Sequence, residues 1–358
     1  MLTRRLSTNL VALGILTGLL FALLAGFLVT AAPVAHAGPH QQARPASSAI
    51  LLHKVTLNES SIDGPALSSI LDNFEGVHFN TAIAWTGTDA LHHLNLRWSS
   101  DDPANGLVHF GNKVTLHETS LARPAVQVTG GGLGLTFVAW TGTDAAHTLN
   151  VMAIYHDGTV VRKLTLWGKT SIVAPALIAW KGGVVLAWTD TSASHSLNVL
   201  PLSMQLQPGV RTVLPQFSSM AGPSLSVYSN TTTQLVLDWT TKTLHLNQAY
   251  STDGVHFTSA LGPGGTPQLS SNAPSSFFHQ SEGAPSNWVS WTGTDAAHHV
   301  NLQWSTHWPQ WPDPATTKLV LGDTALGGSQ IAFNDAFVLA WTGTDALHRL
   351  NVAEFELR

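Results

Sequence analysis

Short apolar segments alternate with polar turns along most of the chain, and one turn recurs at an even spacing. The fullest copy is Trp85-Thr86-Gly87-Thr88-Asp89, which follows an apolar segment and leads to His92 and Asn95. Versions of this turn begin, at steps of 55, 48, 51, 52 and 50 residues, at Trp85, Trp140, Trp188, Trp239, Trp291 and Trp341. A constant period near 50 residues predicts a repeat architecture.

The second repeat shows how one unit is built. Its apolar segments predict four strands, at 124–128, 135–140, 147–154 and 160–166. The turn at Trp140 joins the second strand to the third, and Asp157-Gly158 makes a tight turn before the fourth. No segment after the N-terminal region has sustained helical periodicity. Four short strands per repeat predict the blade of a β-propeller.

The fourth-strand segments predict how the ring closes. The segment His53-Lys54-Val55-Thr56-Leu57 matches Asn112-Lys113-Val114-Thr115-Leu116, yet no first, second or third strand precedes it. The last repeat ends at 351–357 with a third strand that has no fourth strand after it. We therefore predict an all-β fold over residues 50–358. It is a six-bladed β-propeller of four-stranded antiparallel blades, closed by an N-terminal strand that completes the C-terminal blade.

The first residues are typical of an export signal. Arg4 and Arg5 precede a long apolar run, and Ala35-His36-Ala37 is a small-residue cleavage site. We predict a signal peptide at 1–37, a flexible linker at 38–49, and a secreted or extracellular propeller. The apolar run is long enough to span a bilayer, so an uncleaved membrane anchor stays open as an alternative. Any membrane contact is expected through this helix alone.

Composition narrows the class of function. Cysteine is absent, which excludes thiol catalysis and Cys-based metal sites and means that the core itself must stabilise an exported chain. Without residues 1–37, and so without Arg4 and Arg5, 14 basic and 21 acidic residues remain, a net charge of −7. This acidic balance, with no basic run, argues against nucleic acid as a partner.

A turn near the middle of the chain carries a family resemblance. Ser251-Thr252-Asp253-Gly254, followed closely by Phe257, resembles the Asp-box of the sialidase-like propellers. Together with the repeat, it makes residues 50–358 similar to that superfamily, lectin-like rather than catalytic. The resemblance implies that this turn serves folding, on the face opposite the active site. The arginines and the Tyr–Glu pair that such sialidases use are not found here at matching places, and the Arg-Ile-Pro signature is absent.

The repeated turns combine side chains that suit sugar recognition. An indole stacks on the apolar face of a pyranose, while carboxylate, imidazole and amide groups bond its hydroxyls. The predicted ligand-binding residues are Trp85, Asp89, His92, Asn95, Trp140, Asp144, His147, Asn150, Trp291, Asp295, His298, Asn301, Trp341, Asp345, His348 and Asn351. The repeats at Trp188 and Trp239 lack the aspartate at this place and are expected to be weak or empty.

A packing interpretation of the same residues stays open. Tryptophan would wedge between blades, asparagine would bridge them, and Thr, Asp and His would stabilise the turn, with Gly adopting a positive φ. No metal is predicted, because the turns lie too far from the axis to share an ion and a local Asp89–His92–His93 group offers too few ligands. No cofactor or catalytic residue is predicted either.

The function that these residues favour is a secreted carbohydrate-binding, lectin-like propeller with repeated shallow sites on one face. Its partners would be glycans or a cell-surface polysaccharide. The first alternative is a non-catalytic structural or protein-interaction propeller at the cell surface. The second is a glycoside hydrolase such as a sialidase-like enzyme, which the residues disfavour because no pair of loop carboxylates stands out.

Overall fold

The computed structural model describes residues 49–69, 81–100, 108–129, 134–229, 232–260, 268–281, 284–305, 318–334 and 336–357. All of them belong to one unit, Pro45–Arg358. The predicted signal peptide 1–37 and residues 38–48 of the predicted linker lie outside the described residues, whereas Ala49 is the first residue of a strand. Within these ranges no helix has the length and apolar character needed to cross a bilayer.

The strands fall into four positions per blade, from the axis outwards. The innermost strands are β2 (Ala66–Ser69), β7 (Ala125–Val128), β11 (Ala176–Trp180), β15 (Ser224–Ser229), β19 (Ser275–Ser281) and β23 (Gln330–Asn334). The second strands are β3 (Thr81–Thr86), β8 (Thr136–Thr141), β12 (Gly183–Thr189), β16 (Thr233–Thr240), β20 (Ala284–Thr292) and β24 (Ala336–Thr342). The third strands are β4 (His93–Ser100), β9 (Thr148–Ile154), β13 (Ser196–Ser203), β17 (Leu246–Ser251), β21 (His299–Ser305) and β25 (Arg349–Leu357). The outermost strands are β6 (Val114–Thr119), β10 (Val160–Thr170), β14 (Thr212–Ser218), β18 (Thr258–Ser259), β22 (Lys318–Thr324) and β1 (Ala49–Ser60).

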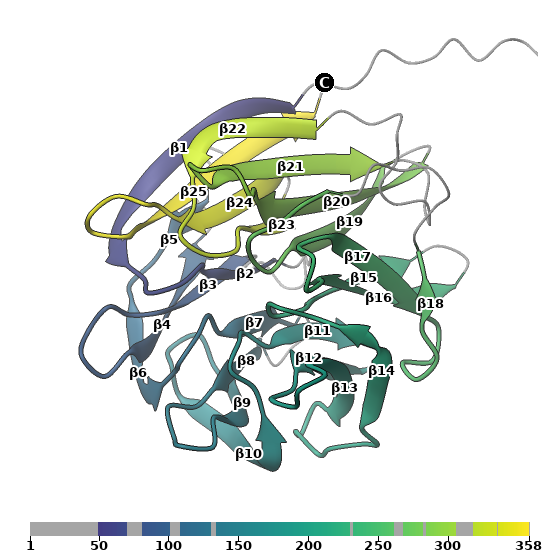
Figure 1. The fold of residues 1–358 in the computed structure, drawn as a ribbon. Coiled ribbons are helices and arrows are strands. Elements are labelled where there is room, and N and C mark those ends of the chain that lie inside the picture. Colours follow the sequence, from purple (N-terminus) through teal and green to yellow (C-terminus); the bar gives the residue numbers. More distant parts are fainter. Residues whose placement is uncertain are drawn as a thin grey trace, which may run out of the picture. The chain divides into compact units, whose positions relative to one another are not determined.

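These strands form six antiparallel sheets, which we number as blades 1 to 6 in the order of their innermost strands. Blade 1 holds one additional short strand, β5 (His109–Phe110), which pairs with β4. The innermost strands gather around a common centre in Figure 1, and the outermost strands lie at the rim. The predicted six-bladed β-propeller is therefore confirmed.

Ring closure joins the two ends of the described chain. Strand β1 pairs antiparallel with β25, and Lys54, Val55 and Thr56 lie opposite Ala353, Val352 and Asn351. Figure 1 shows the purple β1 alongside the yellow β25. Blade 6 is thus completed by a strand from the opposite end of the sequence, and β25 does not end the sheet as an exposed edge.

The core lies between blades rather than within any one of them. Phe137 and Leu149 of blade 2 pack in one cluster with Leu186 and Trp188 of blade 3, all of them buried. Apolar side chains on both faces of each sheet explain this arrangement, because a blade has a neighbour on either side. All six tryptophans that begin the repeated turns are at most 3% exposed.

A repeated hydrogen bond also links each blade to the next. The threonine after each of these tryptophans donates its hydroxyl to a carbonyl in the connection that leads into the following blade. The six bonds run from Thr86 to Ala122, Thr141 to Val173, Thr189 to Ala221, Thr240 to Asn272, Thr292 to Gly327 and Thr342 to Asp63, at 2.6–2.8 Å. The last of these bonds crosses the closure between blades 6 and 1.

Candidate functional site

The six turns between second and third strands form one surface, which we call the loop face: residues 86–92, 141–147, 189–195, 240–244, 292–298 and 342–348. In blade 1 the backbone N–H of Gly87 donates to the His93 carbonyl at 2.8 Å, and that of His92 donates to the Asp89 carbonyl at 3.0 Å. His92 has φ +57°, and the equivalent histidines of blades 2, 3, 5 and 6 have φ between +50° and +57°. The left-handed position of the turn therefore belongs to histidine, and the prediction that Gly adopts it was wrong.

The glycine of the turn serves a different purpose. A Cβ atom added at Gly87 would lie 2.6 Å from Asp89 Oδ2 and 2.9 Å from Asn95 Nδ2. Both atoms are the ends of side chains, so a Cβ at this position would displace the carboxylate and the amide from the places that they hold here. A Cβ at Gly142 would likewise lie 2.7 Å from the carboxylate of its turn, one at Gly293 would lie closer still, and one at Gly343 would lie 3.0 Å from it.

The predicted aspartates are held by their own turns and still reach solvent. Asp89 Oδ1 accepts the backbone N–H of Leu91 at 3.1 Å and His93 Nδ1 at 2.8 Å. Although burial opposes ionisation, the bonds from His93 and from backbone N–H groups lower the pKa of Asp89. The pKa values of Asp144, Asp295 and Asp345 are lowered in the same way: burial is the largest single effect and raises each of them, and the hydrogen bonds to each carboxylate together outweigh it. The side chains of Asp89 and Asp295 are 44% exposed, so both present ionised carboxylates at neutral pH.

The histidines divide into two kinds. His93 and His299, just beyond the predicted His92 and His298, bond the aspartates of blades 1 and 5 through Nδ1 at 2.8 and 2.7 Å. The predicted His92 directs Nδ1 towards the Gly87 carbonyl at 3.3 Å, which leaves Nε2 as the ring nitrogen available to a ligand. His298 repeats this contact in blade 5. His93 and His299 are the histidines that orient the carboxylates, a role that the sequence analysis did not assign to them.

The tryptophans and asparagines do not form an exposed sugar platform. Each tryptophan lies directly opposite an asparagine in the strand register, as Trp85 does opposite Asn95. Asn95 bonds the His93 carbonyl at 2.9 Å and Thr115 at 2.7 Å. The predicted stacking and amide contacts are therefore corrected to packing at the following positions, which are 0–8% exposed: Trp85, Asn95, Trp140, Asn150, Trp291, Asn301, Trp341 and Asn351.

Blade 3 restores the carboxylate from a different position. Asp190 stands where the regular turn has glycine, and Ser192 stands where it has aspartate. Asp190 Oδ1 accepts the N–H groups of Ser192 and Ser196 at 3.1 and 3.2 Å, and Oδ2 accepts Asn198 Nδ2 at 3.3 Å. The turn thus keeps an acidic group, and the expectation of an empty site was based on the wrong residue. Blade 4 has the shorter turn, in which Leu244 takes the positive φ of 65°.

Threonine pairs between adjacent blades were missed in the sequence. Thr119, at the end of β6, bonds Thr143 of the next blade at 2.6 Å, and Thr170 bonds Thr191 at 2.8 Å. A third pair joins Thr324 to Thr344. Beside the first pair lies Leu121, which is 40% exposed and whose N–H donates to the Thr141 carbonyl. The sequence feature that could have indicated these pairs is the second threonine of the repeated turn. The sequence analysis placed its hydrogen bonds within the turn itself rather than between blades.

Among the described residues no three His, Asp or Glu side chains converge in a way that could hold a metal ion. Two carboxyl groups have a raised pKa because they are buried: Asp238 in blade 4, at about 7, and Glu354 in blade 6. These blades are not neighbours in the ring. The two groups therefore do not form the closely spaced acid pair of a glycoside hydrolase.

The turn that resembles an Asp-box is held together internally. Ser251 Oγ accepts the Gly254 N–H at 2.8 Å, and Asp253 Oδ1 accepts the N–H groups of Val255 and His256, both at 2.8 Å. The His256 side chain and these N–H groups hold the pKa of Asp253 well below its usual range. Every one of these bonds stays within the turn, as a folding role requires.

Comparison with known proteins identifies the fold. No protein-family model matches the chain, and no curated protein matches its sequence. A mutant of the Aleuria aurantia lectin in complex with Fucalpha1-6GlcNAc matches 85% of this chain and 96% of its own, at 11% identity and a TM-score of 0.56. A mutant of AofleA from Arthrobotrys oligospora matches 86% of each chain, at 10% identity and a TM-score of 0.55. Trypanosoma rangeli sialidase in complex with sialic acid matches 87% of this chain and 59% of its own, at 11% identity and a TM-score of 0.52. The chain therefore shares the propeller fold of the lectin and of the sialidase.

Proposed function

We propose that the chain is a carbohydrate-binding propeller that recognises glycan hydroxyls through the loop face. The observation that carries this proposal is the set of ionised carboxylates at Asp89, Asp144, Asp295 and Asp345. Each is oriented by N–H groups of its own turn, and each side chain is at least partly exposed to solvent. A carboxylate accepts bonds from two adjacent sugar hydroxyls and is a common polar group in such sites.

The surroundings of the carboxylates suit a shallow site between blades. The threonine pairs supply hydroxyls that donate and accept, and residues such as Leu121 and Leu326 supply a small exposed apolar contact in place of the buried indoles. Weak sites repeated on one face would act together on a glycan-coated surface. The Aleuria aurantia lectin, whose fold this chain shares, has also been solved with alpha-methyl-L-fucoside, so fucosylated glycans are the first ligands to test.

The test is a glycan array probed with the wild-type chain and with a quadruple Asp→Asn variant at residues 89, 144, 295 and 345. We expect roughly a tenfold or larger loss of signal in the quadruple variant, and a smaller loss in each single variant because the sites are multivalent. Asp157→Asn, in a turn on the other side of the blades, is the matched control and should bind as the wild type does. No glycan binding, or full binding by the quadruple variant, would exclude this proposal.

A second candidate is a non-catalytic protein-interaction propeller. The observation that favours it is that the carboxylates already accept several bonds within their own turns, and that the indoles are buried. Secretion, with or without cleavage at residue 37, is part of both proposals. N-terminal sequencing of the exported protein would decide whether the mature chain starts at Gly38.

A further inference from the structure

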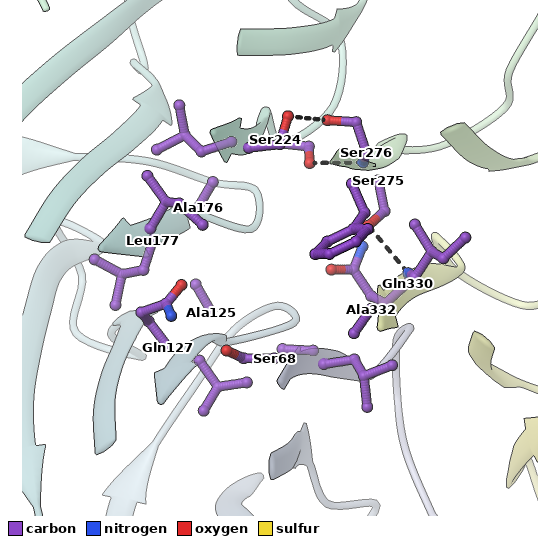
Figure 2. Close-up of a pocket in the computed structure, with 18 of the residues that line it drawn as sticks. Ser68, Ala125, Gln127, Ala176, Leu177, Ser224, Ser275, Ser276, Gln330 and Ala332 are labelled. Carbon is purple, nitrogen blue, oxygen red and sulfur yellow. Dashed lines mark hydrogen bonds between the residues drawn. The ribbon is translucent and has the colours of Figure 1, made fainter. Parts of the chain in front are cut away.

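A cavity of about 180 Å³ lies on the axis of the propeller, lined by all six innermost strands. Figure 2 shows Ser68, Gln127, Ser224, Ser276 and Gln330 arranged around it. This volume is below the roughly 300–1,000 Å³ of pockets that hold drug-sized ligands, so the cavity suits a small polar molecule rather than an oligosaccharide. It is separate from the loop-face turns on which the glycan proposal rests.

The serines in the wall are oriented by the backbone. Ser68 Oγ accepts the Val128 N–H at 3.1 Å, and Ser275 Oγ accepts the Ile331 N–H at 3.1 Å. Ser224 Oγ accepts the Ser276 N–H at 3.3 Å, a bond that can be followed in Figure 2. An innermost strand has one unpaired edge, and these hydroxyls satisfy it. A hydroxyl that accepts in this way keeps its own hydrogen, so each of the three can donate one bond.

Arg123 brings a guanidinium to the lining, near the Asp63 carboxylate: burial lowers the pKa of Arg123, and the charge of Asp63 acts in the opposite direction. The arginine side chain is 3% exposed, and Nη1 has no hydrogen-bond partner among the described residues. Its backbone N–H is bonded by the Asp63 carboxylate at 3.0 Å, which fixes the residue at the start of blade 2. Among the described residues no Asp or Glu lines the cavity, and the amides of Gln127 and Gln330 donate to neighbouring carbonyls. A buried guanidinium N–H without a hydrogen-bond acceptor costs free energy, so an acceptor from a bound molecule would stabilise this group.

A glycine beside the guanidinium leaves the space that it needs. A Cβ added at Gly328 would lie 2.8 Å from Arg123 Nη1 and 2.6 Å from the Ala273 carbonyl oxygen. Any side chain there would displace either the guanidinium or the backbone. The connections into blades 2, 5 and 6 therefore meet at one place, and they leave the arginine in position with an unused donor.

We propose that the axial cavity is a binding site for a small oxyanion, with the chemistry of inorganic phosphate, sulfate or a short carboxylate. Arg123 supplies the charge-assisted bond, and the hydroxyls of Ser68, Ser224 and Ser275 supply neutral donors. Each such anion has two or more oxygen atoms, so it can accept hydrogen bonds from donors of different blades at the same time. Occupancy would link the innermost strands of the ring, so the anion would stabilise the fold.

The test titrates the full chain with sodium phosphate, sulfate or acetate, against sodium chloride at equal ionic strength, by calorimetry and by thermal unfolding. We expect at least one of the three oxyanions to bind saturably and to raise Tm, whereas chloride does not. Arg123→Met should weaken this binding roughly tenfold or more, as expected for a bond to a charged group. Arg162→Met, which removes an exposed arginine of β10, is the matched control and should bind as the wild type does.

A second variant keeps the experiment decisive if Arg123→Met does not fold. Ala179, half-buried at the end of β11, lines the cavity, so Ala179→Phe would fill part of it without touching Arg123. We expect this variant to bind the oxyanion more weakly and to bind glycans on the array as the wild type does. Absence of saturable binding by all three oxyanions, or unchanged affinity in Arg123→Met or Ala179→Phe, would overturn the proposal.

Discussion

Individual residues in this repeat are interchangeable only where a neighbour compensates. Blade 1 combines Gly87 with Asp89, and blade 3 combines Asp190 with Ser192 at the same two places. In the first arrangement a carboxylate occupies the space beside a glycine, and in the second it grows from the glycine position itself. Both arrangements place a carboxylate as the acceptor of the N–H groups of the turn. In these two blades the carboxylate is therefore kept, although it comes from different sequence positions.

Blade 4 places a carboxyl group, Asp238, inside the core. Asp238 stands opposite Gln248 in blade 4, where blade 1 has Ala84 opposite Leu96. It accepts bonds from Gln248 Nε2 at 2.6 Å and Ser276 Oγ at 2.5 Å, and no cation is paired with it among the described residues. Burial raises the pKa of Asp238 to about 7, although these two bonds act in the opposite direction.

This shift predicts a stability that depends on pH. Between pH ~4 and ~7 the folded state holds a proton that the unfolded state has released, so the free energy of unfolding falls as pH rises and levels off above ~7. Asp238→Asn should reduce this slope, leaving the part that the buried Glu354 contributes, and be more stable than the wild type above pH ~7, by an amount on the order of a few kcal/mol. Urea unfolding from pH 5 to 8 measures it. Asp157→Asn, at an exposed turn, should leave the slope unchanged; the same slope in the wild type and in Asp238→Asn would contradict the assignment.

Among the elements, the second strands carry the bonds that keep the blades in register. Each ends in a buried threonine that donates to the connection into the next blade, as Thr86 does to the Ala122 carbonyl at 2.7 Å. Outside this layer, lysines in or just before the outermost strands bond acids of the preceding blade, as in Lys113–Glu59 and Lys163–Glu118. The ion pairs are partly exposed and contribute little, whereas the threonine bond is shielded from water.

We therefore expect Thr86→Val to destabilise the protein by about 0.5–1.5 kcal/mol, because the buried Ala122 carbonyl keeps only the bond from Ser120 Oγ while the side chain at residue 86 keeps its shape. Chemical unfolding monitored by tryptophan fluorescence measures the loss. Thr258→Val, at the exposed strand β18, is the matched control and should change stability by less than about 0.5 kcal/mol. Equal effects of the two substitutions would show that the buried bond has no special weight.

For the whole molecule, strand β1 is what closes the ring. It pairs with β25 in blade 6, Lys54 contacts Asp323 in blade 5, and Lys113 in blade 1 bonds Glu59 at 3.0 Å. One segment thus joins three consecutive blades. Without it, β25 would become an exposed edge strand with unpaired backbone groups, and such edges associate with other chains.

Deleting residues 1–60 should therefore lower Tm by several degrees or more and produce oligomers, whereas deleting residues 1–48 leaves β1 intact and should change neither property. Size-exclusion chromatography with light scattering gives the oligomeric state, and circular dichroism gives Tm. A monomeric 61–358 chain that melts with the 49–358 chain would contradict the role of β1 in closure.

The sequence by itself determined the architecture. Repetition of the turn at Trp85 set the number of blades, and the likeness of 53–57 to 112–116 set the closure, because both depend on local patterns that recur. In blade 2 the strands begin and end within one or two residues of the predicted bounds, except that β10 continues to Thr170. Repetition makes such a fold readable, since each blade solves the same packing problem.

Only the tertiary structure decided which repeated side chains face solvent. A tryptophan at the end of an apolar strand looks the same in sequence whether it stacks on a sugar or packs against the next blade, and here the adjacent blade covers it. The Thr119–Thr143 contact and the cavity beside Arg123 likewise join residues from different blades. Such groups meet only when the ring is closed, because their distances depend on the packing of whole sheets rather than on any local pattern.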